Sequence, residues 1–128
     1  MEAYPDIEIY LAHVDPEALN AWLGDTLGTP PLAPAGKNRW RAQGQHDGHD
    51  IDILLVLKAA DGFASLWFDS PDTPWATDTD CAREAAGRLG CEVRCSLGGW
   101  QPGDDPDRFL QVLPDGQETT IEWPDSGQ

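Results

Sequence analysis

Residues 65–95 read SLWFDSPDTPWATDTDCAREAAGRLGCEVRC, and this stretch decides the fold. An apolar strand runs into a segment dense in Asp, Thr and Pro, which opens an Ala-rich helix that ends at Gly90 before a second strand. Thr73-Pro74 or Thr77-Asp78 caps this helix, because a side-chain oxygen there can accept from the free N–H groups of the first turn. The face that we expect to be buried is small or apolar and would let the helix lie close on a sheet: Cys81, Ala82, Ala85, Ala86 and Leu89.

The acidic turn at residues 69–80 could be a metal site, the mouth of a pocket or the start of the helix. It has the composition of a calcium-binding loop but lacks the central Gly and the Glu at the twelfth position of such loops. Helix capping accounts for its Asp and Thr residues and leaves Trp75 unexplained. We therefore expect a helix start, with Trp75 either packed over a neighbour or forming the wall of a pocket.

The chain before this stretch predicts a strand followed by a helix. Apolar residues alternate with polar or small ones between residues 7 and 11, which is the period of a half-buried strand. The helix at residues 16–27 begins with Asp15 as its cap and a proline at its first position, and it ends at Gly28. One stripe of this helix is apolar and should face the core: Leu19, Trp22, Leu23 and Leu27.

The remaining elements are strands joined by short turns. Asp47-Gly48, Asp61-Gly62 and the residues around Pro114 are typical turn sequences. The proline-rich residues 29–36 read as a stiff connector, unless residues 30–34 supply a short strand. The predicted strands are at residues 38–44, 51–59, 63–70, 91–97, 108–113 and 118–123.

The order of these elements predicts an α+β fold built from two βαββ(β) modules, with a mostly antiparallel curved sheet and two helices packed on it. A single domain would span residues 1–128, with halves at about 5–59 and 63–123. A ferredoxin-like variant is the alternative arrangement.

Several of these motifs resemble the glyoxalase / bleomycin resistance / extradiol dioxygenase superfamily, which has the vicinal oxygen chelate fold. In the second half, CAREAAGRLGCEV leads to FLQVLPDGQETTIEW, with a Pro-Asp-Gly turn before Ile121-Glu122-Trp123. In the first half, Asp15 follows a strand position that is often a ligand by seven residues, and the helix ends with Leu27-Gly28. The resemblance covers most of the chain and implies the two-module fold.

The resemblance also implies where a metal would bind in this chain. Two of the four family ligand positions fall on Glu8 and Glu122, which could bind a divalent metal. The other two fall near Leu54 or Leu55 and near Ser65 or Trp67, which are not comparable ligands. A metal-dependent glyoxalase-like enzyme is therefore the least favoured of three hypotheses, and no cofactor is expected.

The charge of the chain limits its partners. It has 23 acidic and 8 basic residues, a net charge of −15. Such a field repels nucleic acids and anionic membranes and attracts cationic ligands or basic protein surfaces. Adaptation to a salty environment is an alternative explanation for the same bias. No run of residues is long and apolar enough to span a membrane and no signal peptide is visible, so we expect a cytoplasmic protein.

The leading hypothesis is a non-catalytic binding protein, similar to the bleomycin-resistance branch, which sequesters a cationic or aromatic small molecule and would be a homodimer. An acidic groove lined by aromatic rings attracts a cation electrostatically and by cation–π contact. The candidate ligand-binding residues are Trp40, Trp67, Trp75, Trp100 and Trp123, with Glu8 and Glu122 as charged partners.

The alternative hypothesis is an acidic inhibitor or immunity-type protein that binds a basic protein partner. The segment GGWQPGDDPD would be a contact, with Trp100 as its anchor and Asp104, Asp105 and Asp107 around it. The position of the acidic residues separates the two hypotheses. They would surround a deep cleft in a small-molecule binder and cover one face in a protein inhibitor.

Two further motifs have simple structural explanations. HDGHDID contains donors suited to zinc or nickel, but its Asp47-Gly48 pair is a hairpin turn, whose flanking residues are usually polar. The three cysteines have no histidine beside them in the sequence and lie on faces that should be buried. We interpret them as reduced structural thiols.

Overall fold

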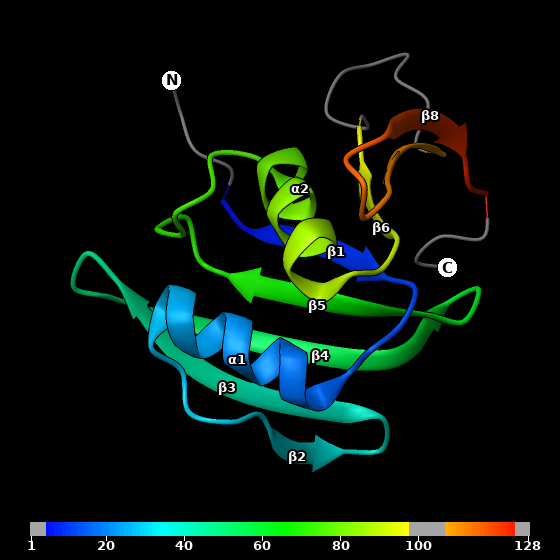
Figure 1. Ribbon diagram of the computed structural model, residues 1–128. Coiled ribbons are helices and arrows are strands. Elements are labelled where there is room, and N and C mark those ends of the chain that lie inside the picture. The colour runs from blue at the N-terminus through cyan, green and yellow to red at the C-terminus, as the bar shows by residue number, and fades with distance from the viewer. Residues whose placement is uncertain (1–4, 98–106, 125–128) are drawn as a thin grey trace.

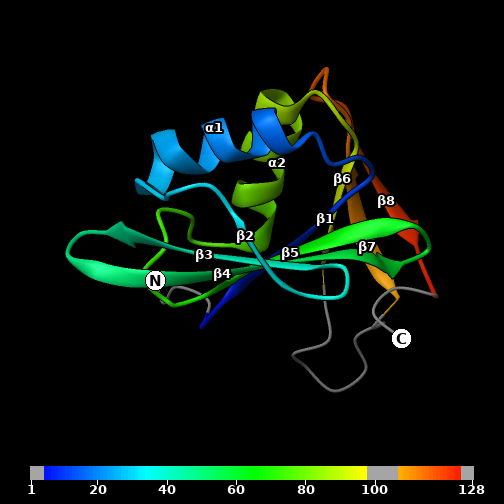
Figure 2. The same ribbon diagram turned by 90° about the horizontal axis from the view of Figure 1, so that it is seen from below.

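The computed structural model describes residues 5–97 and 107–124, which form one curved antiparallel sheet with two helices on one of its faces (Figure 1, Figure 2). Eight strands of these residues lie in the order β2-β3-β4-β5-β1-β6-β7-β8. This confirms the α+β class predicted from the sequence. Along the chain the elements are β1 (Ile7–Leu11), α1 (Pro16–Leu27), β2 (Ala33–Gly36), β3 (Arg39–His46), β4 (His49–Ala60), β5 (Phe63–Asp69), α2 (Asp78–Leu89), β6 (Val93–Ser96), β7 (Arg108–Val112) and β8 (Glu118–Glu122).

Both helices begin and end where their sequences predict. The Asp15 side chain accepts from the backbone N–H of Glu17 at the start of α1, and Thr77 does the same for Asp80 at the start of α2. Each helix ends at a glycine with a left-handed backbone, Gly28 or Gly90, which satisfies the last carbonyls without steric cost. The acidic turn after β5 is therefore the entry to α2.

The main core lies between the helices and the sheet. All four residues of the predicted α1 stripe are buried, and so are Cys81, Ala82, Ala85 and Ala86 of α2. The backbone of β3 passes so close to the end of α1 that a Cβ atom at Gly44 would lie 2.6 Å from a Thr29 methyl carbon. Only glycine allows this approach, which fixes the distance between α1 and the sheet.

The proline-rich connector contains one strand that the sequence left open. Ala33–Gly36 forms β2, a short strand at one edge of the sheet that pairs with β3. Proline lacks a backbone N–H, and an edge strand can accept Pro34 because one of its sides needs no ladder bonds. The interpretation of residues 29–36 as connector alone is thus wrong for their last four residues.

The strand pairing does not follow the two halves of the sequence. β5 opens the second half of the chain, yet it lies between β4 and β1 of the first half. β1 pairs with β5 over five residues but with β6 only at Tyr10 and Leu11. As a result, β6, β7 and β8 turn steeply away from the plane of β3, β4 and β5 (Figure 2).

Asp78 fills the place where β1 and β6 part. The N–H of Glu8 has no strand partner on that side among the described residues and instead donates to the Asp78 carboxylate at 3.2 Å. Burial raises the pKa of Asp78 from 3.8 to about 7; the bond from Glu8 N–H lowers it, and the charges of Asp6 and Glu8 raise it further. The first turn of α2 therefore holds a carboxyl group that titrates near neutral pH.

Candidate functional site: the helix-free face of the sheet

The face of the sheet opposite α1 and α2, here called the helix-free face, has no helix of the described residues over it (Figure 2). Successive side chains of a strand point to opposite faces of the sheet. The residues that alternate with the buried core residues therefore point to the helix-free face. Strand register aligns one row of side chains across β3, β4, β5 and β1: Arg41, Leu54, Trp67 and Glu8. The next row contains Gln43, Asp52 and Asp69.

We call one part of this face the acidic end and define it as Asp6, Asp50, Asp52, Asp69 and Trp67. The half-buried Trp67 donates its indole N–H to Asp6 at 2.7 Å. Asp52 and Asp69 are directly opposite each other on β4 and β5, and both are exposed. Like charges in such a cross-strand pair repel each other, so this arrangement costs stability.

The carboxylates of the acidic end have no cationic partner among the described residues. Asp52 accepts from the Gln43 amide at 2.8 Å, and Asp50 accepts from the Gln45 amide at 3.0 Å. Arg41 lines a small hollow of about 30 Å³ together with Leu54 and three residues of the acidic end, namely Asp52, Asp69 and Trp67. No salt bridge within 4.0 Å joins Arg41 to these aspartates.

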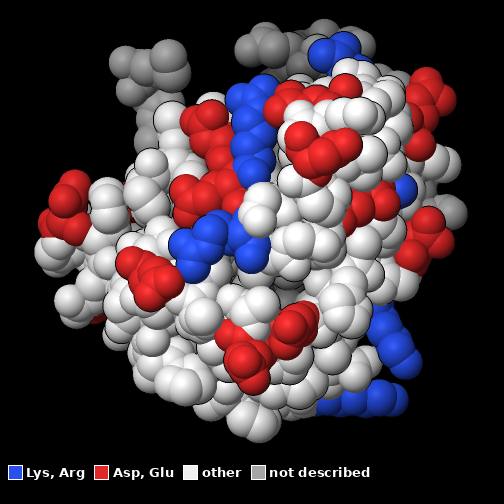
Figure 3. All heavy atoms as spheres, in the orientation of Figure 1, with Lys and Arg blue, Asp and Glu red and all other residues white. Residues whose placement is uncertain are grey.

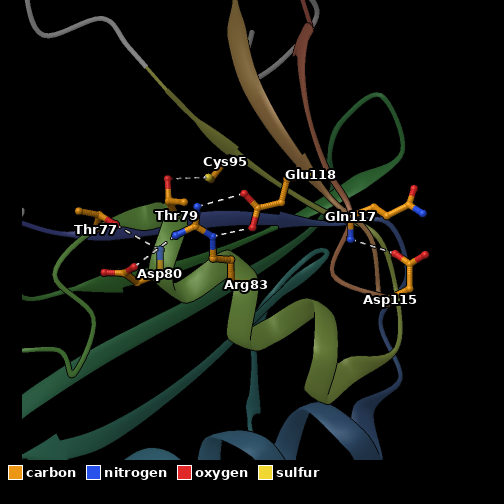
Figure 4. A network of polar contacts seen from close by, with 8 residues as sticks. All are labelled: Thr77, Thr79, Asp80, Arg83, Cys95, Asp115, Gln117 and Glu118. Carbon is orange, nitrogen blue, oxygen red and sulfur yellow. Dashed lines mark hydrogen bonds and ion pairs between the residues drawn. The ribbon is translucent and has the colours of Figure 1, made fainter.

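On the helix-covered face, by contrast, acidic side chains form ion pairs with arginines. Arg83 of α2 forms a paired contact with Glu118 of β8, with N–O distances of 2.6 and 3.0 Å, and also lies near Asp80 (Figure 4). Arg88 donates to Asp25 across the two helices at 2.9 Å. Figure 3 shows the basic side chains next to acidic ones on this face. Several of its carboxylates are thus neutralised within the chain.

We call the other part of the helix-free face the aromatic end and define it as Tyr10, Phe63, Phe109, Trp123 and Arg94. The four rings meet edge to face, with centroids 5.0 to 6.0 Å apart. The Arg94 guanidinium lies 4.4 Å from the centre of the Phe63 ring and 4.7 Å from that of Trp123. Arg94 also bonds to Glu92 at 2.8 Å. The rings therefore form a cation cage that the protein's own arginine occupies.

A buried polar contact separates the two ends. Ser65 donates its hydroxyl to the Glu8 carboxylate at 2.5 Å, and both belong to rows on the helix-free face. Burial raises the pKa of the Tyr10 hydroxyl above its ordinary value, and the charge of Glu8 and a hydrogen bond with it raise it further. The Tyr10 hydroxyl therefore stays protonated at neutral pH.

The structure does not gather the predicted tryptophans into one groove. Trp40 is half-buried on the helix-covered face, whereas Trp67 and Trp123 belong to opposite ends of the helix-free face. Trp100 lies outside the described residues. Trp75 is a core residue that is 5% exposed, and it packs against Phe68 at 5.0 Å between ring centroids. This corrects its assignment as a ligand-binding residue.

Glu84 explains why two tryptophans can be buried in that core. The indole N–H groups of Trp22 and Trp75 both donate to the Glu84 carboxylate, at 2.7 and 3.3 Å. A buried indole needs an acceptor, and a carboxylate at the core boundary provides two. Trp75 thus has a structural role.

Glu8 and Glu122 lie on opposite faces of the sheet. Glu8 faces Ser65 on the helix-free face. Glu122 is exposed on the edge strand β8, between Ile121 and Trp123, which join the aromatic end and so turn Glu122 to the other face. Because two other strands also separate β1 from β8, the structure does not bring these two carboxylates together as one metal site. In residues 5–97 and 107–124, no group of three or more His, Cys, Asp or Glu residues could hold a metal ion.

The histidine-rich turn and the cysteines have the structural roles that the sequence indicates. Asp47 and Gly48 both have positive φ angles, as a two-residue hairpin turn requires, and His46 bonds to the Asp72 carbonyl at 2.8 Å. All three thiols are free, and burial raises the pKa of Cys81 and brings that of Cys95 to about 12. Such thiols stay protonated and are poor nucleophiles.

The chain was compared with known proteins in three ways: no family model, no curated protein and no solved structure matches it. Among the helices of the described residues, none is long and apolar enough to cross a membrane.

Sequence reasoning missed Asp52, Asp69 and Arg94 as members of these sites. The signal for Asp52 was available, because Asp50 and Asp52 alternate with Ile51 and Ile53 and so had to point away from the core. That Asp69 would lie opposite Asp52 depended on the register between β4 and β5, which the sequence alone does not fix.

Proposed function

We propose that this protein is a non-catalytic binding protein that docks a basic protein partner on the acidic end of its helix-free face. The observation that carries the proposal is that the four aspartates of the acidic end form no salt bridge within 4.0 Å to a lysine or arginine of the described residues. Three of them, Asp6, Asp52 and Asp69, lie beside the half-exposed Trp67. The role that fits is that of an inhibitor or immunity-type protein, which blocks its partner by covering a basic surface.

An arginine or lysine side chain of the partner suits this surface. Its cation can lie over the Trp67 ring while Asp52 and Asp69 accept its hydrogen bonds in the small hollow beside that ring. The repulsion between these two carboxylates is relieved when a cation binds between them. A sheet face that is open rather than cleft-like is suited to a protein surface.

A cationic small molecule is less well supported as the ligand. The cation cage of the aromatic end is already occupied by Arg94, whose side chain is 17% exposed. The acidic end is shallow, and its hollow of about 30 Å³ is far smaller than the several hundred Å³ of typical ligand pockets. The open, shallow form of the acidic end therefore favours a protein partner.

We also propose that this chain is related to the vicinal oxygen chelate superfamily. What supports it is that three positions implied by that resemblance, Glu8, Leu54 and Trp67, lie side by side on the helix-free face. These residues include no second strong metal ligand beside Glu8, so the proposed function is binding and involves no metal.

The test uses a nine-residue arginine peptide and follows its binding to ¹⁵N-labelled protein by NMR. We expect the Trp67 indole signal and the amides near Asp52 and Asp69 to shift most. The double variant D52N/D69N should weaken binding about tenfold, because it removes the two carboxylates that contact the cation. Raising the salt concentration should weaken wild-type binding more than binding of this variant.

The control removes the same amount of charge elsewhere. E17Q/E122Q also loses two carboxylates, from exposed positions that lie away from the acidic end. We expect its affinity for the peptide to change less than twofold. If both double variants weaken binding equally, the peptide follows the net charge alone and the proposed docking site is rejected.

A further inference from the structure

An apolar pocket lies on the helix-covered face, between the start of α1 and the β3–β4 part of the sheet. Its volume is about 130 Å³. Apolar side chains make up most of its walls: Val14, Leu19, Leu32, Trp40, Leu55 and Leu57. No charged side chain lines it among the described residues, although the chain as a whole carries a net charge of −15.

This pocket is separate from the acidic end. Trp40 and Leu55 are paired across β3 and β4 and face α1, whereas their neighbours Arg41 and Leu54 face the opposite side of the sheet. A ligand in the pocket would therefore leave the proposed docking surface free, and the two sites can be tested independently.

Asn20 is the polar residue of the pocket wall. Its side-chain oxygen accepts from the backbone N–H of Leu32 at 3.0 Å, which holds the segment before β2 against α1. This bond also fixes the orientation of the amide, so the position of its NH₂ group is determined. Within the described parts of the chain, that NH₂ group has no hydrogen-bond partner. Asn20 therefore gives the pocket wall an amide NH₂ group that is free to donate to a ligand.

We infer that this pocket binds a small uncharged ring compound that carries a hydrogen-bond acceptor. An apolar cavity of about 150 Å³ is known to admit benzene, so a volume of about 130 Å³ suits a single ring. A charged ligand is excluded, because burying a charge without a partner is costly. The ring lies against Trp40, and its acceptor takes the free donor of Asn20.

The probes are acetophenone, which has a carbonyl acceptor, ethylbenzene, which has nearly the same shape without it, and benzoate, which is charged. Binding is followed by ¹H–¹⁵N NMR and by Trp40 indole shifts. We expect saturable shifts around the pocket with acetophenone, about fivefold weaker binding of ethylbenzene because it leaves the donor unpaired, and no binding of benzoate at the same concentration.

Two variants test the pocket and its donor separately. L57W should fill the pocket and weaken acetophenone binding at least about tenfold, while V56W, its neighbour on the opposite face, should not. N20D keeps the oxygen that accepts from Leu32 but loses the donor, so acetophenone should lose its advantage over ethylbenzene. Near-UV circular dichroism confirms that each variant is folded.

Three outcomes would overturn the inference. These are no saturable acetophenone shifts at the pocket residues, equal effects of L57W and V56W, and an unchanged preference for acetophenone in N20D. The arginine-peptide titration should be the same with and without acetophenone, so failure of this inference leaves the proposed docking site unaffected.

Discussion

At the aromatic end of the helix-free face, Arg94 stacks on Phe63 and Trp123, whereas at the acidic end no arginine or lysine of the described residues pairs with the carboxylates around Trp67. Both ends combine a tryptophan with acidic side chains. They differ in whether the chain supplies its own cation. At the aromatic end the cation is internal and its cage is closed.

On the function proposed above, this difference separates a structural from a functional use of the same side-chain types. Trp123 is 4% exposed and belongs to a small second core, which joins the end of β8 to β5 and β1. Trp67 is half-buried and lies beside exposed carboxylates. Like charges opposite each other destabilise the folded chain, and the cation of the proposed partner would offset this cost at the acidic end.

The largest expected effect comes from removing the buried tryptophan. W123A should lower the free energy of unfolding by about 3–5 kcal/mol, because it leaves a cavity among three rings and exposes the cage of Arg94. W67A, at the half-buried position, should cost about 1 kcal/mol. Urea unfolding of both variants measures the two losses. Equal losses would mean that the two ends do not differ in the way described.

The second prediction concerns Asp78, whose pKa the carboxylates of Asp6 and Glu8 help to raise. The folded state holds this proton up to a pH of about 7, and the unfolded state releases it near 3.8, so the free energy of unfolding falls as the pH rises between these values. D78N cannot lose a proton and keeps an acceptor for the Glu8 N–H.

We expect D78N and the wild type to have similar stability near pH 4. The variant should be more stable by about 2–3 kcal/mol at pH 8, where wild-type Asp78 is charged. Urea unfolding at a series of pH values measures this difference. A difference that does not grow between pH 4 and pH 8 would show that Asp78 has an ordinary pKa. D6N should also lower the pKa of Asp78 in an NMR titration, which would connect the charge of the acidic end to the start of α2.

The elements of this fold could be predicted because local rules govern them. Asp15 and Thr77 cap helices by bonding to N–H groups two or three residues away, and Asp61-Gly62 forms a tight turn whatever the rest of the chain does. Such features need no knowledge of distant contacts. For this reason the helix limits and most strand limits agree with the sequence analysis.

The strand order and the position of each tryptophan, buried or exposed, depend on contacts between residues that are distant in the sequence. Trp75 is buried because Glu84 lies where its indole can donate, and Trp123 because Arg94 and Tyr10 meet it from other strands. A single sequence shows that these residues are aromatic, but the face on which each lies follows from pairing. The same limit applies to β5, whose position between β4 and β1 no local pattern indicates.

The smallest expected change in stability is that of R41A, and its comparison with R94A tests the difference between the two ends most directly. R94A removes the cation from the Phe63 and Trp123 rings and one partner of Glu92, so it should lower the free energy of unfolding by about 2 kcal/mol. R41A removes an exposed charge beside the acidic end and should change stability by less than about 0.5 kcal/mol.

For binding of the arginine peptide the order of the two variants should be reversed, with the larger effect in R41A. R41A removes the positive charge nearest to the hollow of Asp52 and Asp69, so the arginine peptide should bind about two- to threefold more tightly than to the wild type. R94A should leave this affinity unchanged, because Glu92 and the cage lie at the other end of the face. If R94A tightened binding as much as R41A, the vacated cage would be a second cation site, and the division into a structural and a functional end would fail.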